Sequence, residues 1–373
     1  MEIKSPFDLL TIQATSLCNL NCSYCYLPDR KINSTFDLSL IPFLFKNLEA
    51  SNLINSKFTI SWHAGEPFVL KPSFYKEAFE IINKCKPSNC AITHAVQTNG
   101  TLITQEYCNL IKEYDIKVGV SIDGPDFIHD RNRKNWAGNG TLEQTLKGIE
   151  LLNKNNIYFN AIVVLTDYSL DFPNEIFDFF AKINCKGIGF NIEEIEGINN
   201  KSSFSNKLLE TKYKKFFSTI FKLSKENKPT MIIREYRKIA NLILNKEGVI
   251  KNGVVTPLNS ITVDTIGNYT VFSPELLTVR HKDYDNFIFG NVKTDLFSDL
   301  FKNIKFQKVY SEILSGVELC KNSCSYFGIC GGGTPSNKLH ENGTFNSAET
   351  MCCKYIRKYL ADVIIEDLEQ VQN

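Results

Sequence analysis

Short apolar runs alternate with longer amphipathic stretches through the first half of the chain. The apolar runs have the length and the β-branched or aromatic content of buried strands. They are Leu9–Ala14, Phe58–Trp62, Ile92–Gln97, Val118–Ile122, Tyr158–Leu165 and Gly187–Ile192. Stretches with an apolar residue every three or four positions lie between them and predict helices. These are Leu38–Ser51, Ser73–Lys84, Gln105–Tyr114, Thr141–Asn153 and Asn174–Lys182.

Strands that alternate with helices predict an α/β fold, in which crossover helices cover a parallel sheet. A closed (β/α)8 barrel needs eight such units, and only six occur here. We therefore expect residues 1–197 to form a partial (β/α)6 barrel of the TIM type. In such folds the functional residues lie at the C-terminal ends of the strands and in the loops that follow.

The pattern changes after residue 197. Residues 198–254 are rich in Lys, Asn and Ser and keep a helical period over Leu208–Leu223 and Ile233–Asn245, which predicts a bridging helical segment. A β-hairpin is predicted from Ser260. The rest of residues 255–373 is poor in periodic signal and holds five cysteines, so we expect a C-terminal domain supported by metal.

Composition narrows the possible functions. With 42 basic and 41 acidic residues the net charge is +1, which argues against a nucleic-acid binder driven by phosphate attraction. The chain has neither a signal-peptide pattern nor an apolar run of about 18 residues, so we expect a cytoplasmic protein with no membrane partner. Its 12 cysteines are then reduced, and those that cluster are expected to bind metal.

The first cysteine cluster follows the first predicted strand directly. Cys18, Cys22 and Cys25 have the spacing C-x3-C-x2-C. Three thiolates can hold three irons of a [4Fe–4S] cluster and leave the fourth iron open to another ligand. A structural zinc ion would need a fourth ligand, and none stands within ten residues. The spacing therefore predicts a cluster with an open iron.

This cysteine spacing, with the aromatic Tyr24 before Cys25, resembles that of the radical S-adenosylmethionine (SAM) superfamily. The resemblance implies that an external flavodoxin- or ferredoxin-type reductant supplies one electron, which splits SAM into methionine and a 5′-deoxyadenosyl radical. The sequence W-H-A-G-E-P at 62–67 resembles the glycine-rich motif of the family, although Ala64 replaces its usual first glycine. There Gly65 and Glu66 would meet the amino group of SAM.

Further motifs resemble those of the family after successive strands. They are Q-T-N-G at 97–100, S-I-D-G-P at 121–125 and F-N-I-E-E-I-E-G at 190–197. Taken alone, S-I-D-G-P fits an ordinary strand-to-turn junction, and the acidic segment fits a solvated turn equally well. The resemblance implies that Ser121 and Arg133 bind the ribose and carboxylate of SAM. The complete set of SAM-binding residues implied is Tyr24, Gly65, Glu66, Gln97, Asn99, Ser121, Asp123, Arg133 and Asn191.

A second cysteine cluster resembles the C-terminal SPASM region of radical SAM peptide maturases, which usually carries two auxiliary clusters. Two cysteines expected around the predicted hairpin at Ser260–Glu275 are missing, with Phe272 at the position of the second, and Thr334 stands where another would fall. The remaining set implies one auxiliary [4Fe–4S] cluster, while a four-cysteine zinc site is the alternative. Its ligands would be Cys320, Cys324, Cys330 and Cys353, with Cys352 as the alternate to Cys353.

Among SPASM proteins the chain resembles cyclophane-forming peptide maturases of the GrrM/OscB type. F-S-P-E-L-L at 272–277 and C-G-G-G-T-P-S-N-K at 330–338 carry much of this resemblance. It implies that a side-chain carbon of a ribosomally made precursor peptide loses hydrogen and then bonds to an aromatic ring. The ring must then lose one proton and one electron to become aromatic again. Glu275 or Glu193 would take the proton. The auxiliary cluster would accept the electron, or it would serve only to support the structure or to position the peptide.

Other reactions remain open on the same scaffold. It could form a thioether or epimerise a residue, or oxidise Cys or Ser as anaerobic sulfatase maturases do, although a single auxiliary cluster counts against the last. A zinc-binding interaction module without catalysis is the alternative from another class. The chain begins almost at the first strand, so we expect the bridging segment, the C-terminal region or a separate protein to bind a peptide leader.

Overall fold

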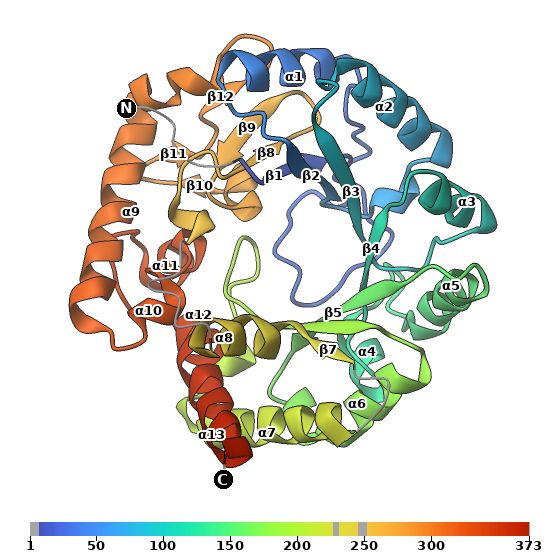
Figure 1. The fold of residues 1–373 in the computed structure, drawn as a ribbon, viewed down its shortest axis with the longest axis vertical. Coiled ribbons are helices and arrows are strands. Elements are labelled where there is room, and N and C mark those ends of the chain that lie inside the picture. Colours follow the sequence, from blue (N-terminus) through green and yellow to red (C-terminus); the bar gives the residue numbers. More distant parts are fainter. Residues whose placement is uncertain (1–6, 227–230, 245–251, 373) are drawn as a thin grey trace.

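The computed structural model describes residues 7–226, 231–244 and 252–372. Its central sheet has the strand order β12-β9-β8-β1-β2-β3-β4-β5-β6-β7, and all neighbouring pairs from β1 to β7 are parallel. The sheet forms an arc with helices on its outer side (Figure 1). All six predicted strands are present, as β1 to β6, at Leu9–Gln13, Lys57–His63, Ala91–Thr98, Lys117–Ser121, Phe159–Leu165 and Gly187–Ile192. The predicted partial α/β barrel is thus confirmed.

The five helices predicted between the strands are also present, each within two residues of its expected ends. These helices pack their apolar faces against the sheet. The buried ring of Trp62 in β2, for example, makes edge contacts with the rings of Tyr75 and Phe79 in α2, with ring centroids 5.4 and 5.8 Å apart. The short helix α4 was not predicted. The outer helices are α1 Leu40–Ala50, α2 Pro72–Cys85, α3 Gln105–Glu113, α4 Asp126–Asn132, α5 Leu142–Lys154 and α6 Pro173–Lys182.

The sheet extends beyond the six barrel strands at both ends. The predicted hairpin forms β8 (Ser260–Val263) and β9 (Asn268–Val271), and β8 pairs in parallel with β1. At the other end β7 (Ile232–Ile233) pairs with β6. The sheet therefore runs across the proposed boundaries between residues 1–197, 198–254 and 255–373. The smaller strands are β10 Arg280–His281, β11 Asp285–Asn286 and β12 Gly290–Asn291.

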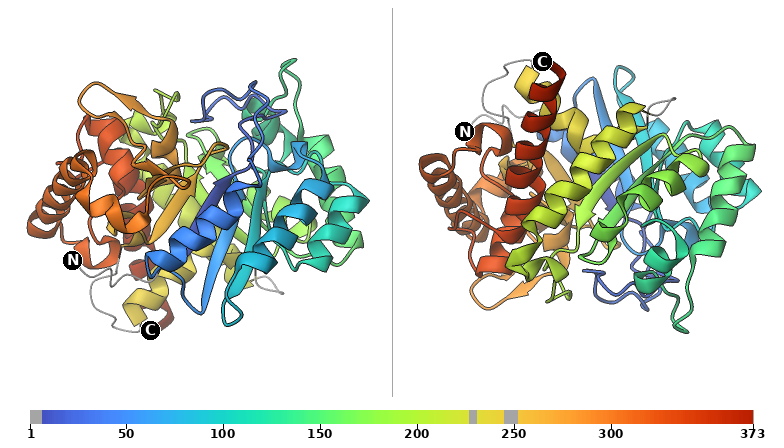
Figure 2. Two further views of the ribbon diagram at one scale, coloured as in Figure 1. Left: turned by 90° about the horizontal axis from the view of Figure 1, so that it is seen from above. Right: turned by 90° about the horizontal axis from the view of Figure 1, so that it is seen from below.

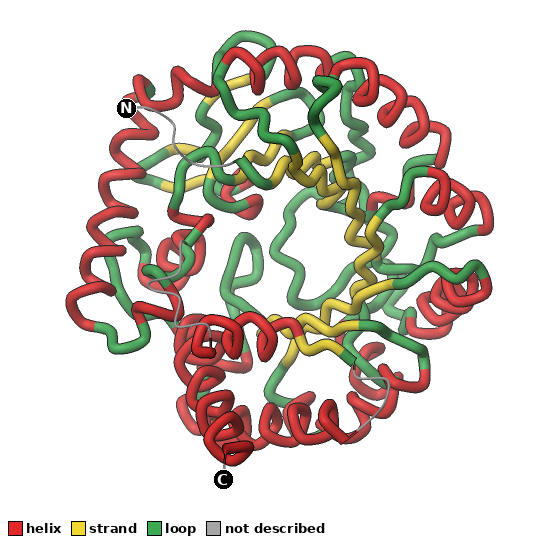
Figure 3. Tube along the Cα trace, viewed as in Figure 1, coloured by secondary structure: helices red, strands yellow, loops and turns green. Residues whose placement is uncertain are grey.

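The C-terminal part of the chain lies across the open side of the arc (Figures 1 and 3). The long helix α9 (Ile304–Ser323) runs along the outside of this part, and α13 (Leu360–Gln372) crosses beside α7, as the views from above and below show (Figure 2). The remaining helices are α7 Glu210–Glu226, α8 Arg234–Leu244, α10 Phe327–Cys330, α11 Pro335–Asn342 and α12 Met351–Cys353. The predicted helix Ile233–Asn245 is α8, and Asn245 lies outside the described residues. In the part of the chain that the structure describes, none of the helices combines the length and apolar character needed to cross a bilayer.

Candidate active site

A cavity of about 310 Å³ lies at the C-terminal ends of the barrel strands. Its wall combines the cysteine loop after β1 with the ends of β2, β3, β4 and β6. The carboxylates of Glu193 and Glu275 also face it. Of the residues expected to contact SAM, all except Asp123 line this cavity, namely Tyr24, Gly65, Glu66, Gln97, Asn99, Ser121, Arg133 and Asn191.

The three cysteines of the first cluster line the same cavity and are free. Their loop is held by its backbone: Cys18 N donates to Arg30 O at 2.9 Å, and the indole of Trp136 donates to Cys18 O at 2.9 Å. Burial, followed by the charge of Glu66, raises the pKa of Cys18 to about 12. A thiolate at this position therefore needs a cation beside it, which iron would supply.

The turn after β2 packs closely on the cysteine loop. Gly65 has φ +56°, and a Cβ on it would lie 2.5 Å from Leu17 O and 2.7 Å from Thr15 O. Backbone atoms cannot move aside easily, so only glycine fits here. The preceding Ala64 also has a positive φ, +76°, which glycine adopts with less strain. The turn thereby packs on the backbone of the cysteine loop in the wall of the cavity.

Glu66 connects the ends of β2 and β3. Its side chain is buried, and its oxygens accept hydrogen bonds from Thr98 Oγ1 at 2.6 Å, Phe68 N at 3.0 Å and Asn99 N at 2.7 Å. Burial raises the pKa of Glu66 to about 6. The carboxylate lines the cavity, but these contacts also give it a role in joining two strands.

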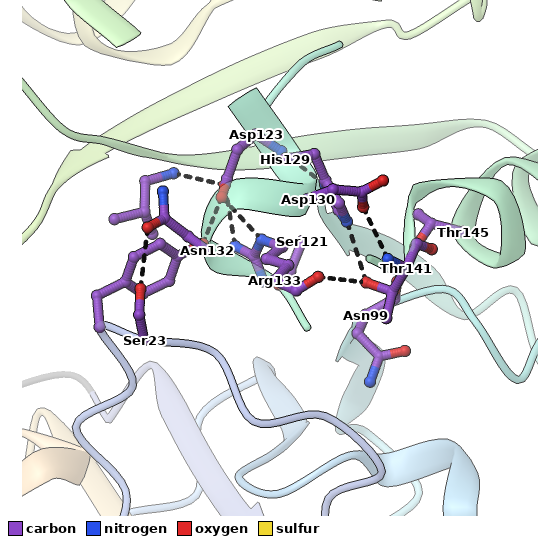
Figure 4. Close-up of polar contacts among 12 residues, drawn as sticks. Ser23, Asn99, Ser121, Asp123, His129, Asp130, Asn132, Arg133, Thr141 and Thr145 are labelled. Carbon is purple, nitrogen blue, oxygen red and sulfur yellow. Dashed lines mark hydrogen bonds and ion pairs between the residues drawn. The ribbon is translucent and has the colours of Figure 1, made fainter. Parts of the chain in front are cut away.

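Asp123 and Arg133 form a buried ion pair (Figure 4). Arg133 Nε lies 3.1 Å from Asp123 Oδ2, and the hydroxyl of Tyr24 donates to the same oxygen. Val164 N donates to Asp123 Oδ1 at 3.0 Å. Burial acts to lower the pKa of Arg133, but Asp123 outweighs it and raises the pKa above that of a free guanidinium. Asp123 thus fixes Tyr24 and Arg133, both of which line the cavity.

Hydrogen bonds also orient the amide side chains of the wall. Gln97 Nε2 donates to Ser121 Oγ at 2.8 Å. Asn191 Oδ1 accepts from Arg234 of α8 at 2.9 Å, which joins the bridging segment to the barrel. These contacts leave the other amide atoms of Gln97 and Asn191 without partners among the described residues, and they are free to contact a ligand.

The acidic side of the cavity is built jointly by the barrel and the C-terminal region. Glu194 accepts hydrogen bonds from Asn337 Nδ2 at 2.8 Å and from the Cys352 thiol at 3.3 Å. Glu196 accepts from the Ser336 hydroxyl. Burial raises the pKa of Glu194, Glu196 and Glu275, and the proximity of Glu275 raises the first two further.

The second cysteine cluster lines a smaller cavity of about 120 Å³, which contains Cys353 but not Cys352. N–H groups donate to three of its sulfur atoms. Gly333 N contacts Cys330 Sγ at 3.2 Å, Thr350 N contacts Cys353 Sγ at 3.4 Å, and Lys338 Nζ contacts Cys320 Sγ at 3.4 Å. Cys324 completes the set of four. Sulfur atoms that accept such hydrogen bonds suit thiolate ligands.

An aromatic core occupies the place of the second of the two cysteines that are missing near the hairpin. Phe272 is buried, and its ring lies nearly parallel to that of Phe306, with centroids 5.9 Å apart and planes at 5°. Tyr310 stacks on the same ring at 6.0 Å. Thr334, at the other replaced position, directly precedes α11. These residues offer no thiolate for a second auxiliary cluster.

Sequence reasoning did not single out several residues of the first cavity. Tyr26 and Thr98 line it, and burial raises the pKa of Tyr26 well above its usual value. Tyr26 directly follows Cys25, and Thr98 lies inside the Q-T-N-G motif at 97–100, so their places in the sequence were the available signal. Over residues 7–226, 231–244 and 252–372, no three His, Cys, Asp or Glu side chains converge closely enough to hold a single metal ion.

Comparisons with known proteins agree with this site. Residues 12–198 match the Radical SAM superfamily. An uncharacterized protein of Synechocystis sp. is 42% identical over 98% of this chain and 93% of its own. The cysteine-type anaerobic sulfatase-maturating enzyme of Clostridium perfringens (strain 13) is 27% identical over 88% of both chains.

Solved structures extend the comparison to the whole fold. Native anSMEcpe with bound AdoMet superimposes with a TM-score of 0.78 at 25% identity, covering 97% of this chain and 98% of that one. SuiB of Streptococcus suis, bound to precursor peptide SuiA, gives a TM-score of 0.63 at 15% identity over 93% of this chain and 76% of its own. The chain therefore belongs to the radical SAM superfamily and is related to its anaerobic sulfatase-maturating enzymes.

Proposed function

We propose that this protein is a radical SAM peptide maturase that crosslinks a ribosomally made precursor peptide. One observation carries the proposal: Cys18, Cys22 and Cys25 share a cavity of about 310 Å³ with the Gly65 turn and with Glu275. Three free cysteines, a glycine turn and a carboxylate with a raised pKa thus line one cavity. The related sulfatase-maturating enzymes and the peptide-bound SuiB support an action on peptides.

The proposed cofactors are a [4Fe–4S] cluster on the three cysteines and SAM at its open iron. When bound, they supply a reductive cleavage that yields a 5′-deoxyadenosyl radical able to remove hydrogen from an unactivated carbon. The chain positions SAM through the Gly65 turn, through Arg133 and through Tyr24. The buried Asp123 holds Tyr24 and Arg133 in place. An external one-electron reductant of the flavodoxin or ferredoxin type completes the system.

The acidic wall of the cavity suits the proton transfer that crosslinking needs. Joining a carbon to an aromatic ring and restoring aromaticity releases one proton and one electron. Burial raises the pKa of Glu275, which makes its carboxylate a better proton acceptor. Glu193 also lines the cavity, but its Oε2 already accepts from Ser203 N at 2.8 Å. We therefore propose Glu275 as the first candidate for the proton acceptor and Glu193 as the second.

The smaller cavity fits one auxiliary [4Fe–4S] cluster on Cys320, Cys324, Cys330 and Cys353. When bound, it supplies an electron acceptor or an anchor for structure and peptide. Thiolates that share a cluster stand farther apart than those that share one ion, which agrees with the lack of a single-ion site in the described residues. The Cys352 thiol donates a hydrogen bond to Glu194 instead, which favours Cys353 as the fourth ligand.

Oxidation of Cys or Ser, as in the sulfatase-maturating relatives, is the second candidate. The similarity to the Clostridium perfringens enzyme over 88% of both chains favours it. The aromatic core around Phe272 counts against it, because the loss of an auxiliary cluster separates this chain from the usual SPASM pattern. Thioether formation and epimerisation use the same cofactors and stay as further alternatives.

Mass spectrometry of a modified peptide separates these reactions. The enzyme, reconstituted without oxygen, is incubated with SAM, a reductant and small peptides encoded beside its gene. A carbon–carbon crosslink removes two hydrogen atoms from a peptide that lacks cysteine, and fragmentation then fails between the two joined residues. A thioether needs a substrate cysteine, and epimerisation leaves the mass in water unchanged. Conversion of Cys or Ser to an aldehyde, which hydrazide reagents label, would replace crosslinking with the second candidate.

A further inference from the structure

Lys338 is a charged side chain buried beside the second cysteine cluster. It lies in α11 with only 3% of its surface exposed. Its Nζ donates to Gly316 O at 2.8 Å and to Cys320 Sγ at 3.4 Å. In the described part of the chain, no carboxylate forms an ion pair with it. The ammonium group therefore contacts one carbonyl and one sulfur.

Burying an ammonium group without a negative partner costs several kcal/mol. A carbonyl oxygen satisfies one donor but carries no net charge. Cys320 is the one contacting group that can become an anion, and its sulfur is an adequate partner only as a thiolate. A thiolate held by metal is deprotonated outright, which would give Lys338 a permanent counter-charge.

The surrounding backbone makes room for this contact. Gly316 occupies a buried position of α9 one turn before Cys320, and a Cβ there would lie 2.1 Å from Phe345 O and 3.1 Å from Lys338 Nζ. A Cβ on Gly333 would lie 3.4 Å from Lys338 Cε. Two glycines thus flank the side chain, so that it reaches the carbonyl and the sulfur on one face of α9.

The contact on Cys320 differs from those on the neighbouring cysteines. Cys330 and Cys353 accept hydrogen bonds from neutral backbone N–H groups. Arg357 and Lys358 also line the cavity, but both are partly exposed, and Lys358 is paired with Glu349. Within the described residues, Lys338 is the buried cation that touches a sulfur of this cluster.

We propose that Lys338 is a positioning residue that sets a buried positive charge against the Cys320 thiolate and thereby favours the reduced form of the auxiliary [4Fe–4S] cluster. The inference rests on the proposed function only in that it needs this cluster to be present. Reduction adds negative charge to a buried group, and a cation at low dielectric stabilises that charge. Hydrogen bonds to cluster sulfurs act in the same direction.

The test uses the chain with Cys18→Ala, Cys22→Ala and Cys25→Ala, so that only the auxiliary cluster gives a signal. Redox titration followed by EPR is then compared with and without Lys338→Met. We expect Lys338→Met to disfavour reduction at least tenfold, which is about 59 mV lower for a one-electron couple. Lys338→Arg keeps the charge and should recover most of the shift.

Lys321→Met is the matched control, because Lys321 adjoins Cys320 in α9 but is 60% exposed and paired with Glu318. Its removal should change the potential much less, since solvent screens an exposed charge. If the intact auxiliary cluster had the same reduction potential with Lys338→Met as with Lys338, the inference would be overturned. An equal shift in Lys321→Met would do the same, because the effect would then not depend on burial.

A second measurement needs no substitution at Lys338. With ¹⁵N-lysine in the protein, pulsed EPR of the reduced auxiliary cluster should detect coupling to one lysine nitrogen. Absence of this coupling would overturn the proposed contact between Lys338 and the cluster. This test would still apply if the Lys338→Met variant failed to bind its cluster. If the three-cysteine variant bound no iron at all, both the auxiliary cluster and this inference would fall. An intact cluster without coupling would remove the inference alone.

Discussion

Arg133 Nε lies 3.1 Å from Asp123 Oδ2, and both side chains are buried, Arg133 in the wall of the larger cavity and Asp123 behind it. Asp123→Asn keeps the shape but leaves the guanidinium without its counter-charge. We expect the free energy of unfolding to fall by about 3–5 kcal/mol, as for other broken buried pairs. Affinity for SAM should fall as well, because Tyr24 loses the same partner. Denaturant unfolding and calorimetric titration with SAM measure the two effects.

A surface pair provides the control for this substitution. Glu143 and Lys147 pair at 2.7 Å on α5, and both are largely exposed. Glu143→Gln should change stability by less than about 0.5 kcal/mol and leave SAM affinity unchanged. If Asp123→Asn were equally mild in both measurements, the ion pair would not organise the cavity.

The turn at Gly65 should tolerate no side chain. Gly65→Ala adds a clash with Leu17 O and Thr15 O to the strain of a positive φ. We expect loss of SAM binding and of iron from the first cluster, measured by calorimetry and iron analysis. Gly138→Ala is the matched control, because Gly138 has φ +85° and open space around its Cβ direction. It should lose only about 1–2 kcal/mol of stability and keep its iron.

Ala64→Gly addresses the departure of this chain from the family motif. Ala64 has φ +76°, and glycine relieves that strain while adding conformational freedom to the unfolded chain. The two effects oppose each other, so stability should stay within about 1 kcal/mol of the wild type. SAM binding should be kept, and a large loss of either would show that the Ala64 methyl group contributes packing that glycine cannot replace.

The adjacent cysteines 352 and 353 should behave differently. Cys353 lines the auxiliary cavity, whereas the Cys352 thiol donates to Glu194. Wild-type protein should contain about eight irons if two [4Fe–4S] clusters are present. Cys353→Ala should lose about four of them, and Cys352→Ala should keep all eight. Iron loss in Cys352→Ala with retention in Cys353→Ala would reverse the assignment.

His129 should make the protein sensitive to acid. Burial lowers its pKa from 6.5 to about 4, and its ring contacts Asp123 N and Thr141 Oγ1, each at 3.3 Å. The unfolded chain binds a proton below about pH 6.5 while the folded chain does not, so stability falls as the pH drops from there towards 4. The loss from this group is roughly 3 kcal/mol. His129→Gln should show a correspondingly shallower loss by denaturant unfolding, and an unchanged slope would contradict it.

The barrel was predictable from the sequence because each strand and helix carries its own local pattern. Helix α9 was not, since two of its buried positions hold Gly316 and Cys320, which weaken the apolar period. Lys338 contacts this helix at Gly316 O and Cys320 Sγ, and local patterns do not reveal such contacts. The pairing of β8 with β1 also escaped prediction, because it joins segments about 250 residues apart.

The site was predictable to a similar degree. The motifs led to nearly every residue of the larger cavity, because each follows a strand and the strand ends converge. The place of Asp123 behind the wall, and the separate surroundings of Cys352 and Cys353, depend on side-chain directions. Buried contacts such as Glu194 with Asn337 join distant segments, and a single sequence contains no signal for them.

Formation of 5′-deoxyadenosine tests the central claim most directly. Protein reconstituted without oxygen is given SAM and dithionite, and the products are measured by liquid chromatography with mass spectrometry. Wild-type protein should form 5′-deoxyadenosine, Cys320→Ala should still form it, and Cys18→Ala should form none. No product from the wild type, or robust production by Cys18→Ala, would contradict the account.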